Sequence, residues 1–444
     1  MRPTRNLGAV LLIAGCLMLA PGCIFGGNGD EDAVPFPSLT PFPNDLTTRL
    51  HEIRDRVSRI RGLSANEGID EGMVSSDTLR DYYAASVNDL DEKEEADLDA
   101  YNVVLKLLGV IGPDDDLRQI YGDEFSSLVA GIYAPEKDAL VLVSAADDVL
   151  GVRDEITIAH EYVHSFQDGK YDLEEFDKRF LEGDLEEDGY TQYSDTLSCL
   201  LEGDASLADE QYAEQVFGAD WQDHVEAESA DDAPPDIDIP EFLVRDFYFN
   251  YNECLDFVRG LYTEGGWATV DAAYSDPPDT TEQLLHIDKY HDRELANIGP
   301  PIDLTEDLEG WKLLDSSQFG EFDVYNWAAT LTGEPAAARA VGAGWGSGWV
   351  RTYRDADDDA RAIVQLSLSW DTENDLREFL GIYDVMLGAL GAQAELVSEG
   401  NVRWTAPGQA GVLFVDDKLE SIEIRVATDA EALAEATADL PQFK

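Results

Sequence analysis

The chain has 444 residues, of which 30 are Lys or Arg and 93 are Asp or Glu, so its formal net charge is −63. A hydrophobic content of 44% with 10% aromatic residues allows a large core and excludes a disordered protein. The negative charge disfavours nucleic-acid binding, because a phosphate backbone needs a basic face. We interpret the charge as adaptation to a salt-saturated environment, where self-repulsion is screened; an acidic partner-binding surface is the alternative.

Residues 1–23 have the pattern of an export signal. Arg2 and Arg5 precede an uncharged apolar run, after which the sequence becomes small and polar. Two segments, "LIAGC" ending at Cys16 and "LAPGC" ending at Cys23, resemble the lipobox of exported lipoproteins. Cys23 leaves the longer apolar run and is the preferred lipid site. We therefore expect an extracellular, cell-surface protein that is lipid-anchored to the cytoplasmic membrane.

Two alternatives to the lipid anchor remain open. One is an uncleaved anchor helix over residues 7–25, which is about long enough to span a bilayer, and the other is plain secretion. A flexible acidic and Pro-containing linker is expected over residues 24–44. No later segment is apolar enough to span a membrane.

Residues 45–304 are expected to form a mainly helical domain with a short β-hairpin. Apolar residues at helical spacing predict helices over residues 45–63, 75–86, 95–112, 190–217 and 240–266. Two β-prone runs on either side of "APEKDA" predict the hairpin within residues 127–144.

From about residue 305 the pattern changes to many short strands with two helices. This predicts an antiparallel α+β domain over residues 305–444, and the fold class of the whole chain is expected to be α+β. The strands are expected within residues 348–355, 360–370, 394–399, 402–406, 410–417 and 419–427, and the helices within residues 370–390 and 429–440.

Residues 156–173, "ITIAHEYVHSFQDGKYDL", contain two of the six histidines of the chain. His160 and His164 are one helical turn apart, so both imidazoles project from one face and can reach a single ion. Glu161 follows His160, where its carboxylate can take a proton from a water at the ion. The motif predicts a catalytic zinc site with Glu161 as general base. A pair of hydrogen-bonded core histidines is the alternative.

A catalytic zinc ion needs a third protein ligand and an open fourth position. The extended motif HExxHxxGxxH is excluded, because Gln167 and Lys170 replace the glycine and histidine that it requires. Glu202 lies in "TLSCLLEGDASLAD" beside two leucines, and a carboxylate in an apolar setting needs a partner such as a cation. We therefore expect Glu202 as the third ligand. The competing acids are Asp195, Asp204 and Asp209, of which the first could instead orient a ligand histidine.

The segments "AHEYVHSFQD" and "LLEGDA" resemble the gluzincin type of zinc metallopeptidase. More narrowly, the chain resembles a group of exported or lipid-anchored surface proteins of extreme halophiles, through "GIYAPEKDALVLV", "DPPDTTEQLLHIDKY", "AVGAGWGSG" and "WDTENDLREF". This resemblance covers most of residues 45–390. It implies a zincin-like catalytic fold for the helical domain, with Zn²⁺ held by His160, His164 and Glu202 and with Glu161 as the base.

His286 is the candidate for a second catalytic residue. It follows two leucines and is expected to face inward more than His291, so that it could stabilise an oxyanion. A hydrogen-bonded structural histidine is the alternative. Tyr133 and Tyr162 are weaker donor candidates, and Gln167 could bind substrate or simply pack.

Cys199 and Cys254 are the two cysteines beyond the export signal. Outside the cell they could pair, but two isolated cysteines are more often buried free thiols. We therefore expect free thiols, with a disulfide as the alternative.

Taken together, these features predict an exported zinc-dependent peptidase that hydrolyses peptide bonds of a peptide or protein substrate with a metal-activated water. The main alternative is a non-catalytic cell-surface binding or structural protein whose zinc site is stabilising or degenerate. A metal-dependent hydrolase acting on another kind of bond is a third possibility.

Overall fold

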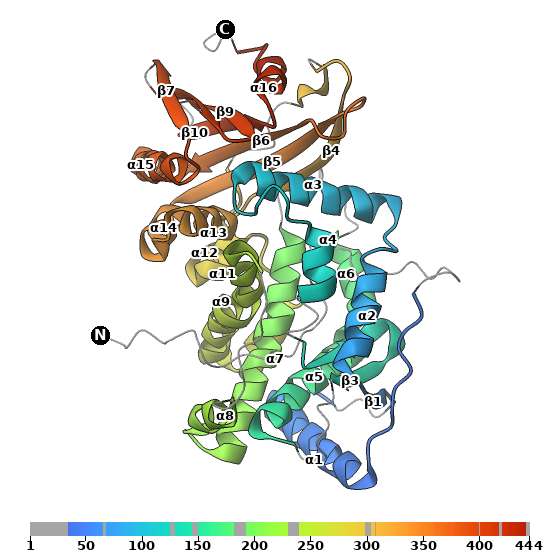
Figure 1. The fold of residues 1–444 in the computed structure, drawn as a ribbon. Helices are drawn as coiled ribbons and strands as arrows, with labels where there is room; N and C mark the ends of the chain where they lie inside the picture. Colours follow the sequence, from blue (N-terminus) through green and yellow to red (C-terminus); the bar gives the residue numbers. More distant parts are fainter. Residues whose placement is uncertain are drawn as a thin grey trace.

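The structure, a computed structural model, combines a mainly helical half with a half built on a large sheet (Figure 1). It describes residues 34–64, 68–124, 129–143, 150–181, 192–229, 239–297, 303–306, 308–398, 400–416 and 420–440. The expected export signal, with Cys16 and Cys23, lies outside these residues, as does the first part of the expected linker. Within the described residues, no helix is both long enough and apolar enough to cross a membrane.

The helical half confirms each of the five helices that apolar spacing predicted, and the HExxH helix as well. Three short helices follow one another after α9, so the chain turns repeatedly there. The bounds are α1 Asn44–Arg61, α2 Ser76–Ser86, α3 Glu92–Leu108, α4 Leu117–Gln119, a π-helical turn Ile120–Glu124, α5 Val152–Tyr171, α6 Leu173–Leu181, α7 Tyr193–Phe217, α8 Trp221–Ser229, α9 Glu241–Gly265, α10 Trp267–Ala273, α11 Thr281–Leu285 and α12 Ile287–Asp292.

A small sheet accompanies these helices. Strands β2 (Gly131–Ala134) and β3 (Ala139–Val143) form the predicted hairpin, and the left-handed conformation of Asp138 closes its turn. The structure adds β1 (Asp70–Val74), which sequence periodicity did not indicate and which pairs parallel to β3. The strand order is β1-β3-β2, which puts β2 next to α5 at one edge.

The large sheet is entirely antiparallel, in the order β4-β5-β6-β10-β9-β8-β7. Helices α3, α13, α14 and α15 lie on the side that faces the helical half, and α16 lies on the other side (Figure 1). The predicted antiparallel α+β character is confirmed. The bounds are β4 Trp311–Gln318, α13 Glu321–Thr332, α14 Pro335–Gly342, β5 Trp345–Asp355, β6 Ala362–Trp370, α15 Glu373–Ala389, β7 Gln393–Ser398, β8 Asn401–Ala406, β9 Gln409–Asp416, β10 Ser421–Ala427 and α16 Ala430–Ala436.

Three elements of this half, β4, α13 and α14, were not predicted, and for β4 and α13 the environment explains why. β4 is an edge strand whose only buried residue is Trp311, so it lacks an apolar alternation. α13 has the opposite character. It is buried on most sides, at Phe322, Val324, Trp327 and Ala328 among others, so no single apolar stripe marks it as a helix.

One hydrophobic core runs through both halves. The largest cluster of buried residues includes Leu105 and Leu108 of α3 together with Leu366 of β6 and Ile424 of β10. The indole Nε1 of Trp327 donates to the backbone oxygen of Leu108 at 3.1 Å. The division of the chain at residues 304 and 305 stays a prediction, but the two halves share buried surface.

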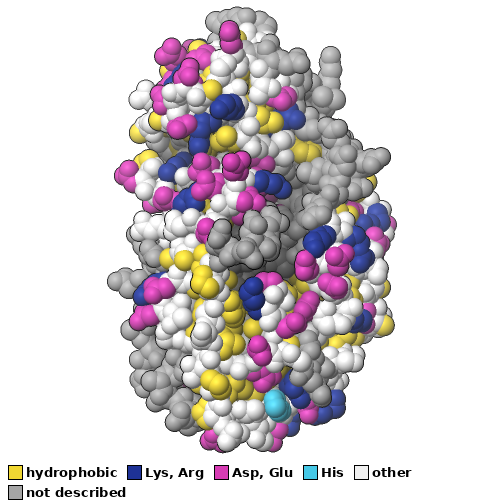
Figure 2. Space-filling view, turned by 90° about the vertical axis from the view of Figure 1, so that its right-hand side faces the viewer, with side chains coloured by type: hydrophobic (Ala, Val, Ile, Leu, Met, Phe, Trp, Pro, Cys, Tyr) yellow, Lys and Arg dark blue, Asp and Glu magenta, His cyan; other side chains and the backbone are white. Residues whose placement is uncertain are grey.

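Some of the few cations of the chain are shared by several acids. Arg361 pairs with Asp355, Asp429 and Glu435. On the face that Figure 2 shows, basic side chains are likewise interspersed among acidic ones. This arrangement lowers the local repulsion that a net charge of −63 would otherwise produce.

The segment "DPPDTTEQLLHIDKYH" forms a junction between the halves. Lys289 on α12 pairs with Glu282 at 2.5 Å and with Glu294 and Asp371 at 2.9 Å each. These three carboxylates lie close enough together to suggest a metal site. The Lys289 ammonium pairs with all three, however, and so occupies the place that a metal ion would take. Asp371 follows β6, so this cluster ties α11 and α12 to the sheet.

Three half-buried acids from different helices interact electrostatically with one another. Asp246 of α9 interacts with Asp195 of α7 and with Asp323 of α13, and it adds to burial in raising the pKa values of the Tyr101 and Tyr121 phenols. Burial raises the pKa of Asp246 to about 7, and the charge of Asp195 adds to the effect. Because this pKa lies above that of an unfolded aspartate, the stabilising contribution is present below about pH 4 and is lost as the pH rises towards 7.

We therefore expect Asp246→Asn to stabilise the protein at pH 8 by about 1–2 kcal/mol and to give no gain at pH 4. The measurement is the free energy of unfolding in urea at constant salt. Asp256→Asn, which removes an exposed acid of the same helix, is the matched control. Equal stability of the two variants at pH 8 would contradict the expectation.

Candidate metal centre

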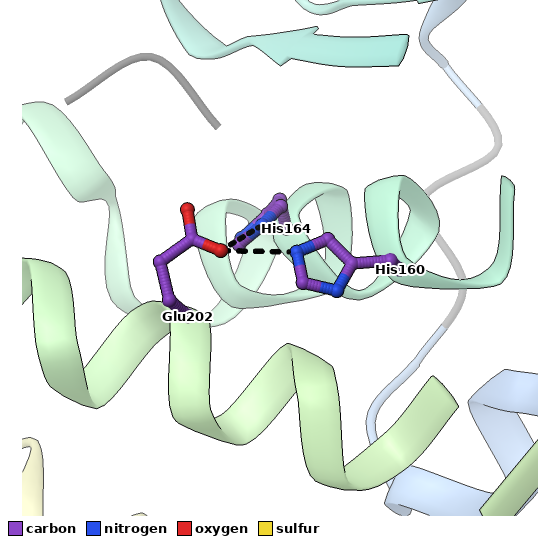
Figure 3. A group of neighbouring side chains, drawn as sticks. All are labelled: His160, His164 and Glu202. Carbon is purple, nitrogen blue, oxygen red and sulfur yellow. Dashed lines mark hydrogen bonds and ion pairs between the residues drawn. The ribbon is translucent and has the colours of Figure 1, made fainter. Parts of the chain in front are cut away.

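The three predicted ligands meet where α5 crosses α7 (Figure 3). The Nε2 atom of His160 lies 3.0 Å from Oε2 of Glu202, and Nε2 of His164 lies 3.7 Å from the same oxygen. One ligand atom of each residue lies within 4.8 Å of the other two. All three side chains point into the space between the two helices.

Local sequence explains why the two helices approach so closely. Ala205 and Ala208 of α7 are fully buried against Ala159 and Val163 of α5, so small side chains form the contact. On its other side α7 is pressed against α9. A Cβ at Gly203 would lie 2.4 Å from the carbonyl oxygen of Cys254, so only glycine fits next to Glu202.

The donor set fits a zinc ion. Two imidazole nitrogens and one carboxylate oxygen at bond lengths near 2.0–2.1 Å would be separated by about 3.3 Å in a tetrahedral site. The observed separations of 3.0 and 3.7 Å bracket that value. Two histidines and a glutamate are also the protein ligands of known catalytic zinc sites.

A carboxylate holds the first histidine in place. The Nδ1 atom of His160 lies 2.8 Å from Oδ2 of Asp209, about two helical turns beyond Glu202 on α7. A proton on Nδ1 leaves the Nε2 lone pair directed at the ligand position. Asp195 was the alternative that could orient a ligand histidine, and the structure gives this contact to Asp209 instead. Asp195 lies nearly two turns before Glu202, next to Asp246 and Asp323.

Without a metal, the charged forms of His160 and Glu202 stabilise each other. Burial lowers the pKa of His160, but its hydrogen bonds to Asp209 and Glu202 outweigh burial and hold that pKa well above its usual range. Burial raises the pKa of Glu202, but His164 and His160 more than offset burial and lower it. A cation between these groups would replace the imidazolium proton as the partner of Glu202.

Glu161 lies inside the protein beside the triad. Its side chain is 0% exposed, and within the described residues neither of its carboxylate oxygens has a hydrogen-bond partner. Burial raises its pKa to about 6, although the charges of His164 and His160 act in the opposite direction. A buried carboxylate without a partner is costly, so its place beside the ligands calls for an explanation.

Strand β2 covers Glu161. A Cβ at Gly131 would lie 3.4 Å from Cγ of Glu161 and 3.2 Å from Cγ2 of Thr157. The backbone N–H of Tyr133, two residues further on, lies near enough to lower the pKa of Glu161 as a weak donor, but it does not reach hydrogen-bonding geometry with either carboxylate oxygen. The edge strand of the small sheet therefore lies directly against the face of α5 that carries Glu161.

The structure does not bring His286 to the triad. Its Nε2 lies 3.0 Å from Oε1 of Glu321, and the neighbouring Thr281 is hydrogen-bonded to Gln192 at the start of α7. That point is ten residues, or about 15 Å of helix, before Glu202. The His286 side chain is 32% exposed and that of His291 is 45% exposed, so His286 is the more buried of the two, as expected, but its ring lies at the junction between the halves.

The weaker donor candidates are engaged elsewhere. The Tyr133 hydroxyl donates to Asp168 at 2.8 Å, and the Tyr162 hydroxyl donates to Glu71 at 2.9 Å. The aromatic side chain that sequence reasoning missed is Tyr251 of α9, whose ring centre lies 6.1 Å from that of His160. Helix α9 carries so many aromatic residues that nothing in its pattern distinguishes this one.

The expectation of free thiols is wrong in this structure. Cys199 of α7 and Cys254 of α9 form a disulfide, and both are fully buried. Their pairing depends on the close contact of the two helices at Gly203, which is not visible in the sequence. The disulfide lies one helical turn before Glu202 and fixes the segment that carries it.

Comparison with known families concerns only the second half of this mixed α+β protein. Residues 312–437 match a family described as "Domain of unknown function (DUF8575)". The matched residues run from β4 through α16 and do not include the triad or Glu161. No curated protein and no solved structure matched the chain.

Proposed function

We propose that the protein is a zinc-dependent peptidase in which His160, His164 and Glu202 hold the metal and Glu161 is the general base. The observation that carries the proposal is the buried carboxylate of Glu161, which has no hydrogen-bond partner among the described residues and lies beside a donor set suited to zinc. A purely stabilising zinc site has no use for a base next to the ion.

In the proposed mechanism, different residues transfer the proton, orient a zinc ligand and stabilise the oxyanion. Bound zinc supplies Lewis acidity, which polarises a carbonyl and acidifies water. The Glu161 carboxylate takes a proton from the attacking water and delivers it to the nitrogen of the leaving amine. Asp209 holds His160 through Nδ1, and Tyr251, whose ring lies near that of His160, is a candidate for donating a hydrogen bond to the oxyanion in place of His286.

Strand β2 favours a peptide as the substrate. Among the described strands it is the last one of the small sheet, and Gly131 packs against Glu161. An extended peptide can add to a sheet edge through main-chain hydrogen bonds. Such an addition would place a scissile peptide bond beside the base.

We further propose that the protein works outside the cell, attached to the membrane by a lipid at Cys23, in a salt-rich environment. The export pattern and the charge of −63 support this location. The disulfide between Cys199 and Cys254 also favours an oxidising compartment.

One observation favours the rival function, a stabilising zinc site in a non-catalytic surface protein. His160, His164 and Glu202 are only 2%, 0% and 3% exposed. Structural zinc sites are closed, whereas catalytic ones keep one position open to substrate. The two functions therefore predict different effects of removing the metal.

The test is zinc content and casein hydrolysis in molar salt, with and without a chelator. We expect one zinc per chain, hydrolysis that stops on chelation and returns with zinc, and only a modest loss of stability in the metal-free protein. Chelation that unfolds the protein, combined with no hydrolysis at any salt concentration, would favour the stabilising site instead.

A further inference from the structure

We propose that Gln167 is a positioning residue that fixes the tautomer and orientation of His164, so that its Nε2 lone pair faces the metal. This inference rests on the proposed role of His164 as a ligand. Sequence reasoning considered substrate binding or simple packing for this glutamine. Its contacts point to a third role, because its amide joins the HExxH helix to the helix that carries Glu202.

The orientation of the Gln167 amide follows from its partners. One partner is the backbone oxygen of Leu201 at 3.0 Å, which can only accept, so the atom facing it is the Nε2 donor. The amide oxygen therefore faces Nδ1 of His164, at 2.8 Å. Since an amide oxygen can only accept, Nδ1 carries a proton, and in the neutral imidazole the lone pair is then on Nε2. That Nε2 lies on the side of Glu202.

A buried chain of donors and acceptors continues behind Gln167. The second amide hydrogen of Gln167 is directed at the Tyr274 hydroxyl at 3.0 Å, and that hydroxyl donates to Oδ2 of Asp204 at 2.7 Å. Both oxygens of Asp204 accept from Arg61 of α1. Gln167, Asp204 and Arg61 are each 0% exposed, so water does not compete for these bonds.

Every member of this chain has a fixed direction. Arg61 can only donate, so Asp204 accepts; Asp204 then accepts from Tyr274, which leaves the hydroxyl oxygen to accept from Gln167. The direction of every hydrogen bond from the Arg61 guanidinium to the His164 imidazole is therefore fixed. In addition, the Leu201 carbonyl is directly next to Glu202 in the chain, so one glutamine sets the spacing between two of the three ligands.

The test compares Gln167→Leu with Gln365→Leu. Gln365 is the matched control, because it is also 0% exposed and both of its amide atoms are hydrogen-bonded, to Tyr353 and Glu423 in the distant sheet. The first readout is the tautomer of His164 in the metal-free protein at mildly alkaline pH, from long-range ¹H–¹⁵N spectra of histidine-labelled protein, which contains six histidines. The second readout is the Kd for zinc, from competition with a chelator.

We expect the Nδ1–H tautomer of His164 in the wild type, a mixture of tautomers in Gln167→Leu, and a Kd for zinc that is about 10–100-fold higher in that variant. Gln365→Leu should leave both readouts unchanged. Tyr274→Phe should weaken zinc binding less than Gln167→Leu, because Leu201 still holds the amide.

The inference is overturned if the wild type shows the Nε2–H tautomer, or if Gln167→Leu binds zinc within about threefold of the wild type. It is also overturned if both leucine variants lose the same affinity, since this would indicate a general loss of structure. A wild-type protein that binds no zinc would refute the proposed function, whereas the tautomer readout would still decide the contact between Gln167 and His164.

Discussion

Glu161→Gln is expected to lower kcat for peptide hydrolysis by about 10²–10⁴-fold while leaving one zinc bound per chain. The amide has nearly the shape of the carboxylate, so the ligands on α5 and α7 keep their geometry. It has no basic oxygen that could take a proton from water, so the step that depends on the base is lost. Zinc content and initial rates on the same preparation measure both effects.

Glu155→Gln is the matched control for this substitution. Glu155 is a second buried glutamate of α5, but it is hydrogen-bonded to Arg49 and Tyr212 and not to the triad. We expect this variant to be less stable, with normal turnover per folded molecule. If Glu161→Gln retained full activity, the base would be another group. If it lost its zinc, Glu161 would be acting as a ligand.

The triad could be predicted from sequence because its geometry is mostly local. His160 and His164 share a helical face by spacing alone, and Glu202 stands out as an acid beside Leu200 and Leu201. A buried acid needs a partner wherever it lies, so this argument does not require the tertiary structure. The contact between α5 and α7 brings the three residues together as expected.

Residues that act through distant partners could not be predicted in this way. Gln167 takes its orientation from Leu201 and from Tyr274, which lies 107 residues further along the chain. His286 shows the complementary limit. Its neighbours Leu284 and Leu285 indicate the side of the chain on which the ring lies, but they do not indicate which residue it contacts. In the structure the ring contacts Glu321 at the junction.

The fold shows the same division between local and distant information. Strands such as β6 could be predicted from the sequence, because most of their residues are apolar and buried. β1 does not, because it is short and its pairing with β3 joins residues about 70 positions apart, such as Gly72 and Val141. The close contact of α7 with α9 depends on Gly203, and with it the pairing of Cys199 and Cys254.

Replacing both cysteines, in Cys199→Ala/Cys254→Ala, is expected to lower the free energy of unfolding by about 2–4 kcal/mol. The disulfide closes a loop with a sequence separation of 55 residues, and opening it restores conformational entropy to the unfolded chain. Because the bond lies one turn before Glu202, we also expect the variant to bind zinc more weakly. Urea unfolding at constant salt and chelator competition measure the two effects.

Reduced wild-type protein is the control, because it lacks the cross-link but keeps both sulfur atoms in the core. Refolded and unfolded under reductant, it should approach the urea midpoint of the double variant, and any remaining difference reports the loss of packing. Both sulfurs are fully buried, so reductant should act slowly on the folded protein and quickly once urea opens it. If oxidised and reduced wild type unfolded at the same urea concentration, the two cysteines would be unpaired in solution, and the anchoring of Glu202 would depend on Gly203 and helix packing alone.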